Sequence, residues 1–376
     1  MSTTMYHERS ATRTWGGNVA SRCPQGLFDA YQQIVGDKRL NWTEHHRLIR
    51  HLGSGGQGIV YLTQRRSTDN FTLPVALKVF TPEPYDSEHA YDTAMGRIAH
   101  VAAHVAQIQQ DNLLDVHNWV DRHRIRIMEM EWIDGFDLNQ LLDNRMLEHL
   151  RYRVSTKRWE QINEVIVTAG PTHPRLKPGV AIAIIRDCLA ALAALHREGI
   201  VHGDLKPSNI MIKRTGNAKI VDIGSAFEME NLPAIRTCTP AYAAPEVLER
   251  SESTPRSDLA SLGYVLIQML SGTPPFAGRT SYQDLLEAKR LLAQRLPKIL
   301  PEDVARNDLL MTFCQRLIAP DPMYRFPSAE EADLLDKGAA SFHRQLVKGN
   351  LSSEYDNDIR IWLGELEDYL KPPSSD

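Results

Sequence analysis

Cysteine is scarce in this chain of 376 residues, which contains only Cys23, Cys188, Cys238 and Cys314. Their wide spacing matches no zinc-binding pattern and no disulfide framework, so the sequence predicts a protein of a reducing cytoplasm. A run of about 18 apolar residues, which could span a membrane, is also lacking. The N-terminus has no apolar segment typical of a secretory signal, so we expect neither secretion nor a membrane partner.

Excess charge of one sign is lacking as well. The net charge is -4, with 43 basic and 47 acidic residues, which argues against general binding to nucleic acid or to an acidic membrane. The small basic cluster 151–158 is interpreted as a solvated face. A hydrophobic content of 42% is ordinary for a globular protein. The length allows two modest lobes.

A segment near the middle of the chain gathers the residue types of a phosphoryl-transfer site. It reads His-Gly-Asp-Leu-Lys-Pro-Ser-Asn over residues 202–209, and Asp-Ile-Gly follows at 222–224. An Asp can orient a hydroxyl group, and a Lys can meet the moving phosphoryl group. Amide and carboxylate oxygens are the ligands that Mg²⁺ prefers, so Asn209 and Asp222 are candidate metal ligands.

A glycine-rich loop and a strand lysine precede this segment. The loop reads Gly-Ser-Gly-Gly-Gln-Gly over residues 53–58, and glycines let backbone amides approach phosphates closely. Residues 59–62 continue as a strand, whereas a dinucleotide-binding fold would need a helix there. Lys78 lies in the apolar strand 75–80, where phosphate binding is favoured over a side chain that merely reaches to solvent.

The order of these motifs over residues 47–337 resembles the eukaryotic-type (Hanks-type) serine/threonine protein kinase family, with His-Gly-Asp in place of His-Arg-Asp. Two further motifs carry the resemblance, Thr-Pro-Ala-Tyr-Ala-Ala-Pro-Glu at 239–246 and Asp-Leu-Ala-Ser-Leu-Gly at 258–263. The resemblance implies an α+β, bilobal protein-kinase fold with a small β-rich N-lobe and a larger α-helical C-lobe. It also implies ATP and Mg²⁺ as cofactors and a protein substrate.

The resemblance assigns an ATP site to residues of both lobes. Lys78 would bind the phosphates, Asp137 would reach the ribose, and the backbone of Glu131 and Ile133 would bond the adenine. Met130 would be the gatekeeper at the back of the adenine pocket. The full expected set is Gly53, Ser54, Gly55, Gly58, Val60, Ala76, Lys78, Met130, Glu131, Ile133, Asp137 and Met211.

The same resemblance assigns the catalytic roles. Asp204 would be the catalytic aspartate, and Lys206 is the lysine typical of serine/threonine kinases. Asn209 and Asp222 would hold Mg²⁺, and Thr239 would bond toward Asp204 and Lys206. These five residues, with Lys78, form the predicted catalytic centre.

Two further carboxylates are expected to have structural roles. Glu246 would pair with Arg325 of Asp-Pro-Met-Tyr-Arg at 321–325. Asp258 would brace the backbone of the catalytic loop.

The chain departs from the family at Gly203, where an arginine usually precedes the catalytic aspartate. That arginine normally gathers a phosphate on the activation loop. Upstream of Thr237 this loop holds only Ser225 as a hydroxyl, and it carries Glu228 and Glu230. We therefore predict activity without loop phosphorylation. His-Gly-Asp also occurs in aminoglycoside and choline kinases, so phosphorylation of a small molecule is an alternative function.

A second departure lies in the helix after Lys78. Family members place a Glu there that pairs with the lysine, and its spacing falls near His100 or Val101. Residues 93–110 contain no acid. Asp92, or else Glu88, would replace the Glu if the helix is longer than usual. If no acid reaches Lys78, we expect a slow enzyme or one that needs a partner to align the lysine. The missing Glu also supports the alternative of a pseudokinase, meaning a nucleotide-binding scaffold.

The predicted domain organisation has three parts. Residues 1–46 form an N-terminal extension with a short helix over 27–35. Residues 47–337 form the kinase domain, with an N-lobe at 47–134, a C-lobe at 135–337 and a polar surface insertion at about 144–178. Residues 338–376 form a helical C-terminal extension with an apolar face. We expect both extensions to pack on the kinase domain, and a regulatory partner bound by them is the alternative.

Overall fold

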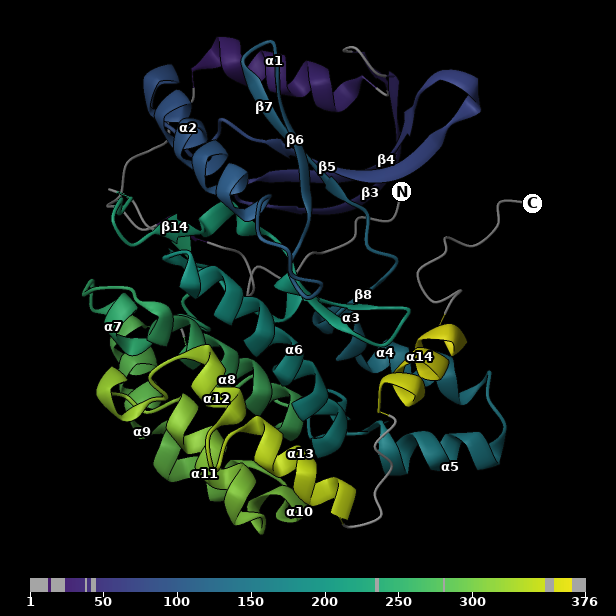
Figure 1. Cartoon of the computed structure of the whole chain (residues 1–376), viewed down its shortest axis with the longest axis vertical. Helices are drawn as coiled ribbons and strands as arrows, with labels where there is room; N and C mark the ends of the chain where they lie inside the picture. Colours follow the sequence, from purple (N-terminus) through teal and green to yellow (C-terminus); the bar gives the residue numbers. More distant parts are fainter. Residues whose placement is uncertain are drawn as a thin grey trace. The chain divides into compact units, whose positions relative to one another are not determined.

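The computed structural model describes residues 13–14, 24–37, 39–41, 45–233, 237–279, 281–348 and 355–366. The chain forms two compact units (Figure 1). The sheet unit comprises residues 1–109, 114–133 and 222–240, and the helical unit comprises residues 110–113, 134–221 and 241–376. Each unit has its own core, as the α+β bilobal fold requires.

A six-stranded antiparallel sheet forms the sheet unit, in the order β2-β3-β4-β5-β7-β6. Two short strands, β1 and β15, pair with each other in a separate sheet. The elements of this unit are β1 (Arg13–Thr14), α1 (Gln25–Gly36), β2 (Arg39–Asn41), β3 (His45–Gly55), β4 (Gly58–Arg66), η2 (Thr68–Asn70), β5 (Thr72–Phe80), α2 (Glu88–Val105), β6 (Val116–Arg122), β7 (Ile125–Glu131), η4 (Ile223–Ser225), β14 (Phe227–Glu228) and β15 (Thr237–Cys238).

Strand β5 lies in the interior of this sheet, between β4 and β7. Its residues 75–80 are all buried, as their apolar run predicts for a strand covered on both faces. Gly58 begins β4 with a φ of 142°, and a Cβ there would lie 2.0 Å from the carbonyl oxygen of Val79. Only glycine lets the loop close this tightly on β5.

Helices α1 and α2 complete the sheet unit. The helix predicted over 27–35 is confirmed: α1 buries Leu27, Tyr31 and Ile34, and it packs beside β7 (Figure 1). Helix α2 begins earlier than its apolar periodicity suggests, because the Ser87 side chain accepts a hydrogen bond from the N–H of Ala90 and caps the helix.

The helical unit is built around α6 and α8, whose apolar stripes the sequence predicts. Its elements are β8 (Gly135–Asp137), α3 (Leu138–Leu141), α4 (Asn144–Arg151), α5 (Thr156–Val165), β9 (Val167–Thr168), β10 (Arg175–Leu176), α6 (Pro178–Arg197), β11 (Ile200–Val201), η3 (Pro207–Asn209), β12 (Ile210–Lys213), β13 (Ala218–Ile220), α7 (Pro245–Leu248), α8 (Pro255–Ser271), α9 (Tyr282–Ile299), α10 (Glu302–Ala305), α11 (Asp308–Leu317), η5 (Pro322–Tyr324), α12 (Ala329–Leu334), α13 (Ala339–Lys348) and α14 (Tyr355–Glu365).

Helix α6 is the central helix of this unit, in contact with α8, α12, α13 and α14 (Figure 1). By length and composition alone α6 could cross a membrane, although the sequence shows no unbroken apolar run. Its most apolar window is 72% buried inside the protein, which is the usual state of a core helix.

The insertion at 144–178 is predicted to lie on the surface, but in the structure part of it is buried. It forms α4, α5 and the hairpin β9–β10, and it buries Met146, Leu150, Ile162 and Leu176 completely. The apolar residues are too widely spaced among charged ones to reveal a core element in the sequence. The insertion is therefore polar outside and part of the core inside.

The C-terminal helix α14 packs on α6, as predicted for its apolar face. Ile359, Trp362 and Leu363 are fully buried. The Tyr355 ring lies so close to Gly179 that a Cβ there would meet its Cζ at 2.0 Å. Arg158 of α5 also pairs with Glu365, with 2.7 Å between Nε and Oε1, so this arginine is not merely solvated. Tyr369 and Leu370, whose spacing in the sequence continues this apolar face, lie outside the described residues.

Candidate active site

Lys78 on β5 is the centre of a polar cluster in the sheet unit. Its side chain is buried, and its Nζ donates to Oδ1 of Asp222 and, at 2.9 Å, to Oε1 of Gln57. The Gln57 amide in turn donates to Oγ of Ser225 at 3.0 Å. The Asp222 carboxylate compensates the buried ammonium charge, which could not be stable alone in this position.

The backbone at Asp222 explains how its carboxylate reaches Lys78. Asp222 has a φ of 64°, in the left-handed region that Asp tolerates better than most residues. Its carboxylate also accepts the N–H of Gly224 at 3.1 Å and so caps η4. A Cβ at Gly224 would lie 2.1 Å from Oε1 of Gln57, so the glycine of Asp-Ile-Gly makes room for the polar cluster.

The expected pairing of Lys78 with Asp92 or Glu88 is wrong in this structure. Asp92 binds Arg124 and Arg126, each at 2.8 Å, and Glu88 binds Arg124. Both acids lie in the first turns of α2, where a carboxylate is favoured by the helix dipole. The two arginines of the β6–β7 hairpin hold them there, and Lys78 takes Asp222 instead.

The glycine-rich loop is the hairpin that joins β3 and β4. Gly53, Ser54 and Gly55 pair with Val60, Ile59 and Gly58 respectively. A Cβ at Gly53 or Gly55 would meet no atom within 4 Å, so the space beside these residues is open. The predicted phosphate-covering loop is thus a turn between strands, and no helix follows it.

The register of the sheet places the expected adenine residues on one face. Val60 lies directly opposite Lys78, and Ala76 lies opposite Met130. Directly opposed residues of antiparallel strands, and residues two apart on one strand, point to the same side. Val60, Ala76, Lys78 and Met130 therefore share a face, as a nucleotide-binding wall would require.

The predicted hinge follows at the end of β7. The N–H of Glu131 donates to the carbonyl of Asp115 at 3.0 Å, so this N–H is committed to the protein. Ile133 is buried and ends this part of the sheet unit. The predicted adenine contacts of both residues stay predictions.

The segment at 202–209 is held as a buried loop in the helical unit. The Lys206 ammonium lies 3.0 Å from Oδ2 of Asp204, and both side chains are nearly inaccessible. Nδ2 of Asn209 donates to the carbonyl of Asp204 at 2.8 Å. The lysine and the carboxylate are thus neighbours, and the Asn209 amide has a fixed orientation.

Asp258 on α8 anchors the backbone of this loop, as predicted. It accepts the N–H of His202 at 2.8 Å and that of Gly203 at 2.9 Å, and it contacts Nε2 of His196 at 2.9 Å. Burial alone would raise the pKa of the Asp258 carboxyl, but the bond and charge of His196, with the two loop residues, hold this pKa below its usual range.

Asp137 and Met211 face each other across two strands of the helical unit. Asp137 on β8 lies directly opposite Met211 on β12, and the predicted nucleotide contacts of both residues stay predictions. Burial raises the pKa of Asp137 to about 6, although backbone N–H groups of Gln140 and Asn139 partly counter this. Its carboxyl therefore titrates unusually close to neutral pH.

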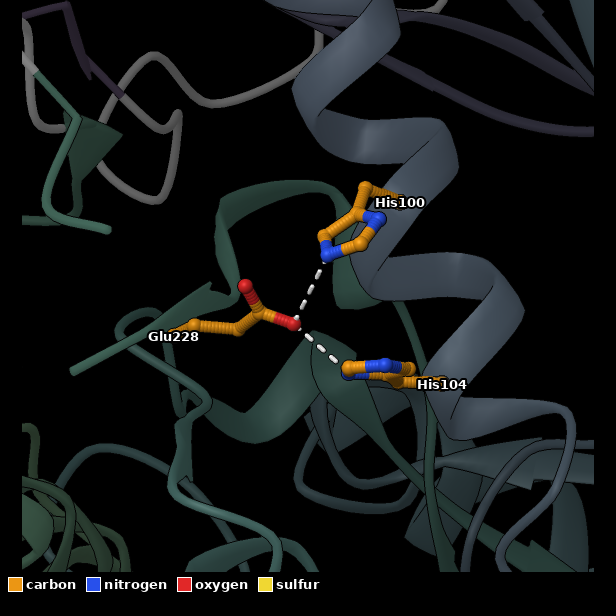
Figure 2. Close-up of side chains that lie close together, drawn as sticks. All are labelled: His100, His104 and Glu228. Atoms are coloured by element: carbon orange, nitrogen blue, oxygen red, sulfur yellow. Dashed lines mark ion pairs between the residues drawn. The ribbon is translucent and has the colours of Figure 1, made fainter. Parts of the chain in front are cut away.

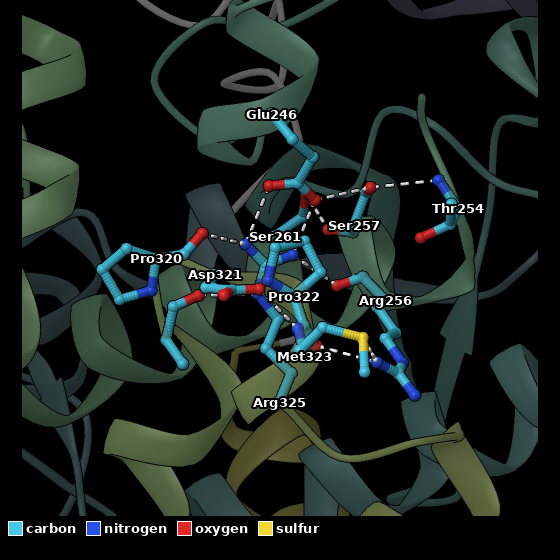
Figure 3. Close-up of polar contacts among 11 residues, drawn as sticks. Glu246, Thr254, Arg256, Ser257, Ser261, Pro320, Asp321, Pro322, Met323 and Arg325 are labelled. Carbon is cyan, nitrogen blue, oxygen red and sulfur yellow. Dashed lines mark hydrogen bonds and ion pairs between the residues drawn. The ribbon is translucent and has the colours of Figure 1, made fainter. Parts of the chain in front are cut away.

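The predicted pair of Glu246 and Arg325 is confirmed (Figure 3). It is bidentate, with 2.6 Å from Nη1 to Oε1 and 2.8 Å from Nη2 to Oε2. Ser257 donates to Glu246 at 2.7 Å, and the guanidinium also donates to the carbonyls of Ala319, Arg256 and Pro320. All polar contacts of this buried charge pair stay within the helical unit.

Thr239 was predicted as a site residue, whereas Gln57 was not. Thr239 is buried in the sheet unit, and its predicted bond toward Asp204 and Lys206 stays a prediction. Gln57 was not predicted as a site residue, although it binds Lys78. Its position between glycines of the loop was visible in the sequence, but its partner was not.

Asn209 and Asp222 suit Mg²⁺ by the chemistry of their oxygens. The Asn209 amide nitrogen donates to the Asp204 carbonyl, so the amide oxygen, which accepts only a long contact of 3.5 Å from Oγ of Ser208, is the candidate ligand atom. The Asp222 side chain is 35% exposed and carries two hard carboxylate oxygens. Each residue fits the ion, and bound Mg²⁺ would offset the negative charge of nucleotide phosphates.

Comparisons with known proteins place these motifs in a family. The sequence model of the protein kinase domain matches residues 46–333. Serine/threonine-protein kinase PrkC of Bacillus subtilis is 26% identical over 298 residues, which are 77% of this chain and 40% of PrkC. PknH of Mycobacterium tuberculosis is 32% identical over 235 residues, which are 61% of this chain and 32% of PknH. PknD of the same species is 29% identical over 297 residues, 76% of this chain and 38% of PknD. The chain thus spans less than half the length of each of these relatives.

Proposed function

This chain belongs to the protein kinase family, and we propose that it is an ATP-dependent serine/threonine protein kinase. The observation that carries the proposal is the pairing of Asp204 with Lys206 on a loop anchored by Asp258. The similarity to bacterial proteins named serine/threonine kinases supports it. The sequence departs at Gly203 and in α2, but Lys78, Asp204, Asn209 and Asp222 are all retained.

The proposed chemistry is positioning and charge compensation. Asp204 orients the substrate hydroxyl and accepts its proton, while Lys206 offsets charge on the transferred phosphoryl group. Lys78 binds nucleotide phosphates after exchanging part of its contact with Asp222 and Gln57. Mg²⁺, held by Asn209 and Asp222, would neutralise phosphate charge.

The test is transfer of labelled phosphate from Mg-ATP to a generic protein, followed by identification of the modified residue. Phosphoserine or phosphothreonine supports the proposal. Nucleotide binding without transfer would favour a pseudokinase. Transfer to an aminoglycoside or to choline, with none to protein, would favour the small-molecule alternative.

We further propose that turnover needs no phosphate on the activation loop. Gly203 offers no cation, and its φ of 77° suits a residue without a Cβ. The one loop hydroxyl upstream of Thr237, Ser225, already accepts a bond from Gln57. A loop phosphate, found by mass spectrometry, whose removal abolishes transfer would contradict this.

A reducing cytoplasm is the proposed location. Cys188 and Cys314 are free thiols in buried positions, as suits a compartment that keeps thiols reduced. A regulatory partner at the terminal extensions is a weaker proposal. The apolar face of α14 is already covered by α6, so such a partner would have to bind its other face.

A further inference from the structure

Three potential metal ligands meet where α2 approaches β14. His100 and His104 stand one turn apart on α2, and their ring centroids are 4.9 Å apart. Figure 2 shows both rings turned toward the Glu228 carboxylate. Oε1 of Glu228 lies 3.3 Å from Nε2 of His100 and 2.6 Å from Nδ1 of His104. All three side chains belong to the sheet unit.

The surroundings leave the two histidines accessible and shield the carboxylate from solvent. The side chains of His100 and His104 are 58% and 47% exposed, and that of Glu228 is 16% exposed. Oε1 of Glu228 is itself shielded from solvent and points at the imidazoles. An ion could therefore enter from the histidine side and find a positioned carboxylate behind it.

We propose that His100, His104 and Glu228 form a binding site for a divalent transition metal ion of the Zn²⁺ type. Two histidines at i and i+4 on a helix, with one carboxylate, are a donor set that Zn²⁺ favours. The three ligand atoms lie within 4.8 Å of one another. The half-exposed histidines leave a fourth position for water.

The distances require only a small adjustment. Zn²⁺ binds nitrogen and oxygen at about 2.0–2.2 Å, so neighbouring ligand atoms of a tetrahedron are about 3.3 Å apart. The contact of 3.3 Å between His100 and Glu228 already has this length. The contact of 2.6 Å between His104 and Glu228 must widen by a side-chain rotation, because it now has the length of a hydrogen bond.

The ion would join α2 to the segment that begins at Asp222. Helix α2 packs against η4 and β14, and η4 follows Asp222, the partner of Lys78. The resemblance to kinases puts the lysine-binding Glu near His100, which has no carboxylate to offer. The bound metal ion would hold α2 against this segment, in place of the ion pair that the helix Glu and the lysine form in other kinases. This regulatory part alone depends on the proposed function.

The direct test is calorimetric titration of the chelator-treated, full-length protein with Zn²⁺. The wild type is expected to bind one ion saturably, and His100→Ala and His104→Ala are each expected to weaken binding at least tenfold. Glu228→Gln keeps the shape and should also weaken it. His89→Ala, an exposed histidine on the same helix, is the matched control and should bind as the wild type does. A Cys23→Ser background removes a thiol outside the described residues that could bind zinc elsewhere.

Two further readouts separate metal coordination from simple loss of stability. Co²⁺ bound in place of Zn²⁺ should give the visible d–d absorption bands of a tetrahedral or similarly low-symmetry site. The variant His104→Ala should not show these bands. Zn²⁺ should raise the melting temperature of the wild type and of His89→Ala, but not that of His104→Ala. No saturable binding, or equal binding in the double variant His100→Ala/His104→Ala, would overturn the proposal and leave a His–Glu cluster joined by ion pairs.

The metal site and the proposed activity can fail separately. Zn²⁺ binding without any phosphate transfer leaves the site standing and refutes the kinase proposal. Transfer by a protein that binds no Zn²⁺ refutes the site alone. If both hold, the transfer rate of the wild type is expected to change with Zn²⁺ in the presence of saturating Mg-ATP, while that of His104→Ala stays constant. A wild-type transfer rate that is independent of bound Zn²⁺ would refute the regulatory role of the metal ion.

Discussion

At the scale of single residues, the site is governed by how buried charges find partners. Lys78 binds Asp222 and Gln57, since its usual partner on α2 is absent and the acids at the start of that helix bind arginines. Nucleotide phosphates would have to compete with these contacts. The uncharged Gln57 amide competes with the nucleotide phosphates for the Lys78 ammonium, so removal of this amide should strengthen nucleotide binding.

Replacement of Gln57 by Ala tests this competition. It removes one hydrogen bond from Lys78, whose net value is about 1 kcal/mol, so the KM for ATP should fall roughly threefold to tenfold with little change in kcat. Steady-state kinetics measures both constants. Gln32→Ala, an exposed glutamine on α1, is the control and should leave them unchanged. An unchanged or higher KM in Gln57→Ala would show that Gln57 does not compete with ATP.

Asp137 should make nucleoside binding dependent on pH. Its pKa is raised from 3.8 to about 6, so the folded protein holds this proton more tightly than the unfolded chain. The group's contribution to stability is therefore complete below about pH 4 and is lost as the pH rises through about 6. The ionised Asp137 carboxylate can accept hydrogen bonds from the ribose hydroxyls. At about pH 5, roughly nine tenths of the Asp137 carboxyl groups would be protonated.

Adenosine is the suitable probe because it carries no titrating phosphate. Its affinity, measured by calorimetry, should fall by up to about tenfold from pH 7 to pH 5 as Asp137 becomes protonated. Asp137→Asn should bind adenosine with an affinity that does not vary over this range. The same pH profile in both proteins would remove Asp137 from the ribose site.

At the scale of elements, buried polar pairs fix where loops join the helices. The bidentate pair of Glu246 and Arg325 joins α7 to the segment after η5 (Figure 3). Asp258 joins α8 to the loop at 202–203. Lys289 of α9 adds a third connection, since its buried ammonium lies over the rings of Tyr264 and Phe276 and donates to the carbonyl of Ala241 at 2.8 Å.

Loss of Arg325 should be far more costly than loss of a surface arginine. Arg325→Ala leaves Glu246 as a buried, uncompensated charge, so the free energy of unfolding should fall by about 3–5 kcal/mol. Arg306→Ala, whose side chain is 77% exposed, is the control and should change it by less than about 0.5 kcal/mol. Denaturant titration measures both.

A milder variant protects this test against failure to fold. Arg325→Lys keeps the charge and loses the bidentate geometry, so its stability should lie between those of the wild type and Arg325→Ala. Equal stabilities of Arg325→Lys, Arg306→Ala and the wild type would show that the pair does not stabilise the helical unit.

For the whole molecule, the sequence predicted those features that depend on local periodicity or on ordered motifs. The bilobal α+β fold, the strand at 75–80, the pair of Glu246 with Arg325 and the role of Asp258 could all be read from ordered motifs. The partner of Lys78 could not, because Asp92, Glu88 and Asp222 compete for basic groups only in the folded chain. Sequence spacing also gave no sign that Glu228 meets His100 and His104, since 124 residues separate Glu228 from His104.

Asp204 is the residue on which the proposed phosphoryl transfer depends most. The most direct measurement compares the wild type with Asp204→Asn for transfer of labelled phosphate from Mg-ATP, with nucleotide binding measured in parallel. Asparagine keeps the size of the side chain but cannot accept the proton, so transfer should fall by about a hundredfold or more while ATP still binds. Equal transfer by both proteins, or none by the wild type with ATP bound, would contradict a catalytic role of Asp204.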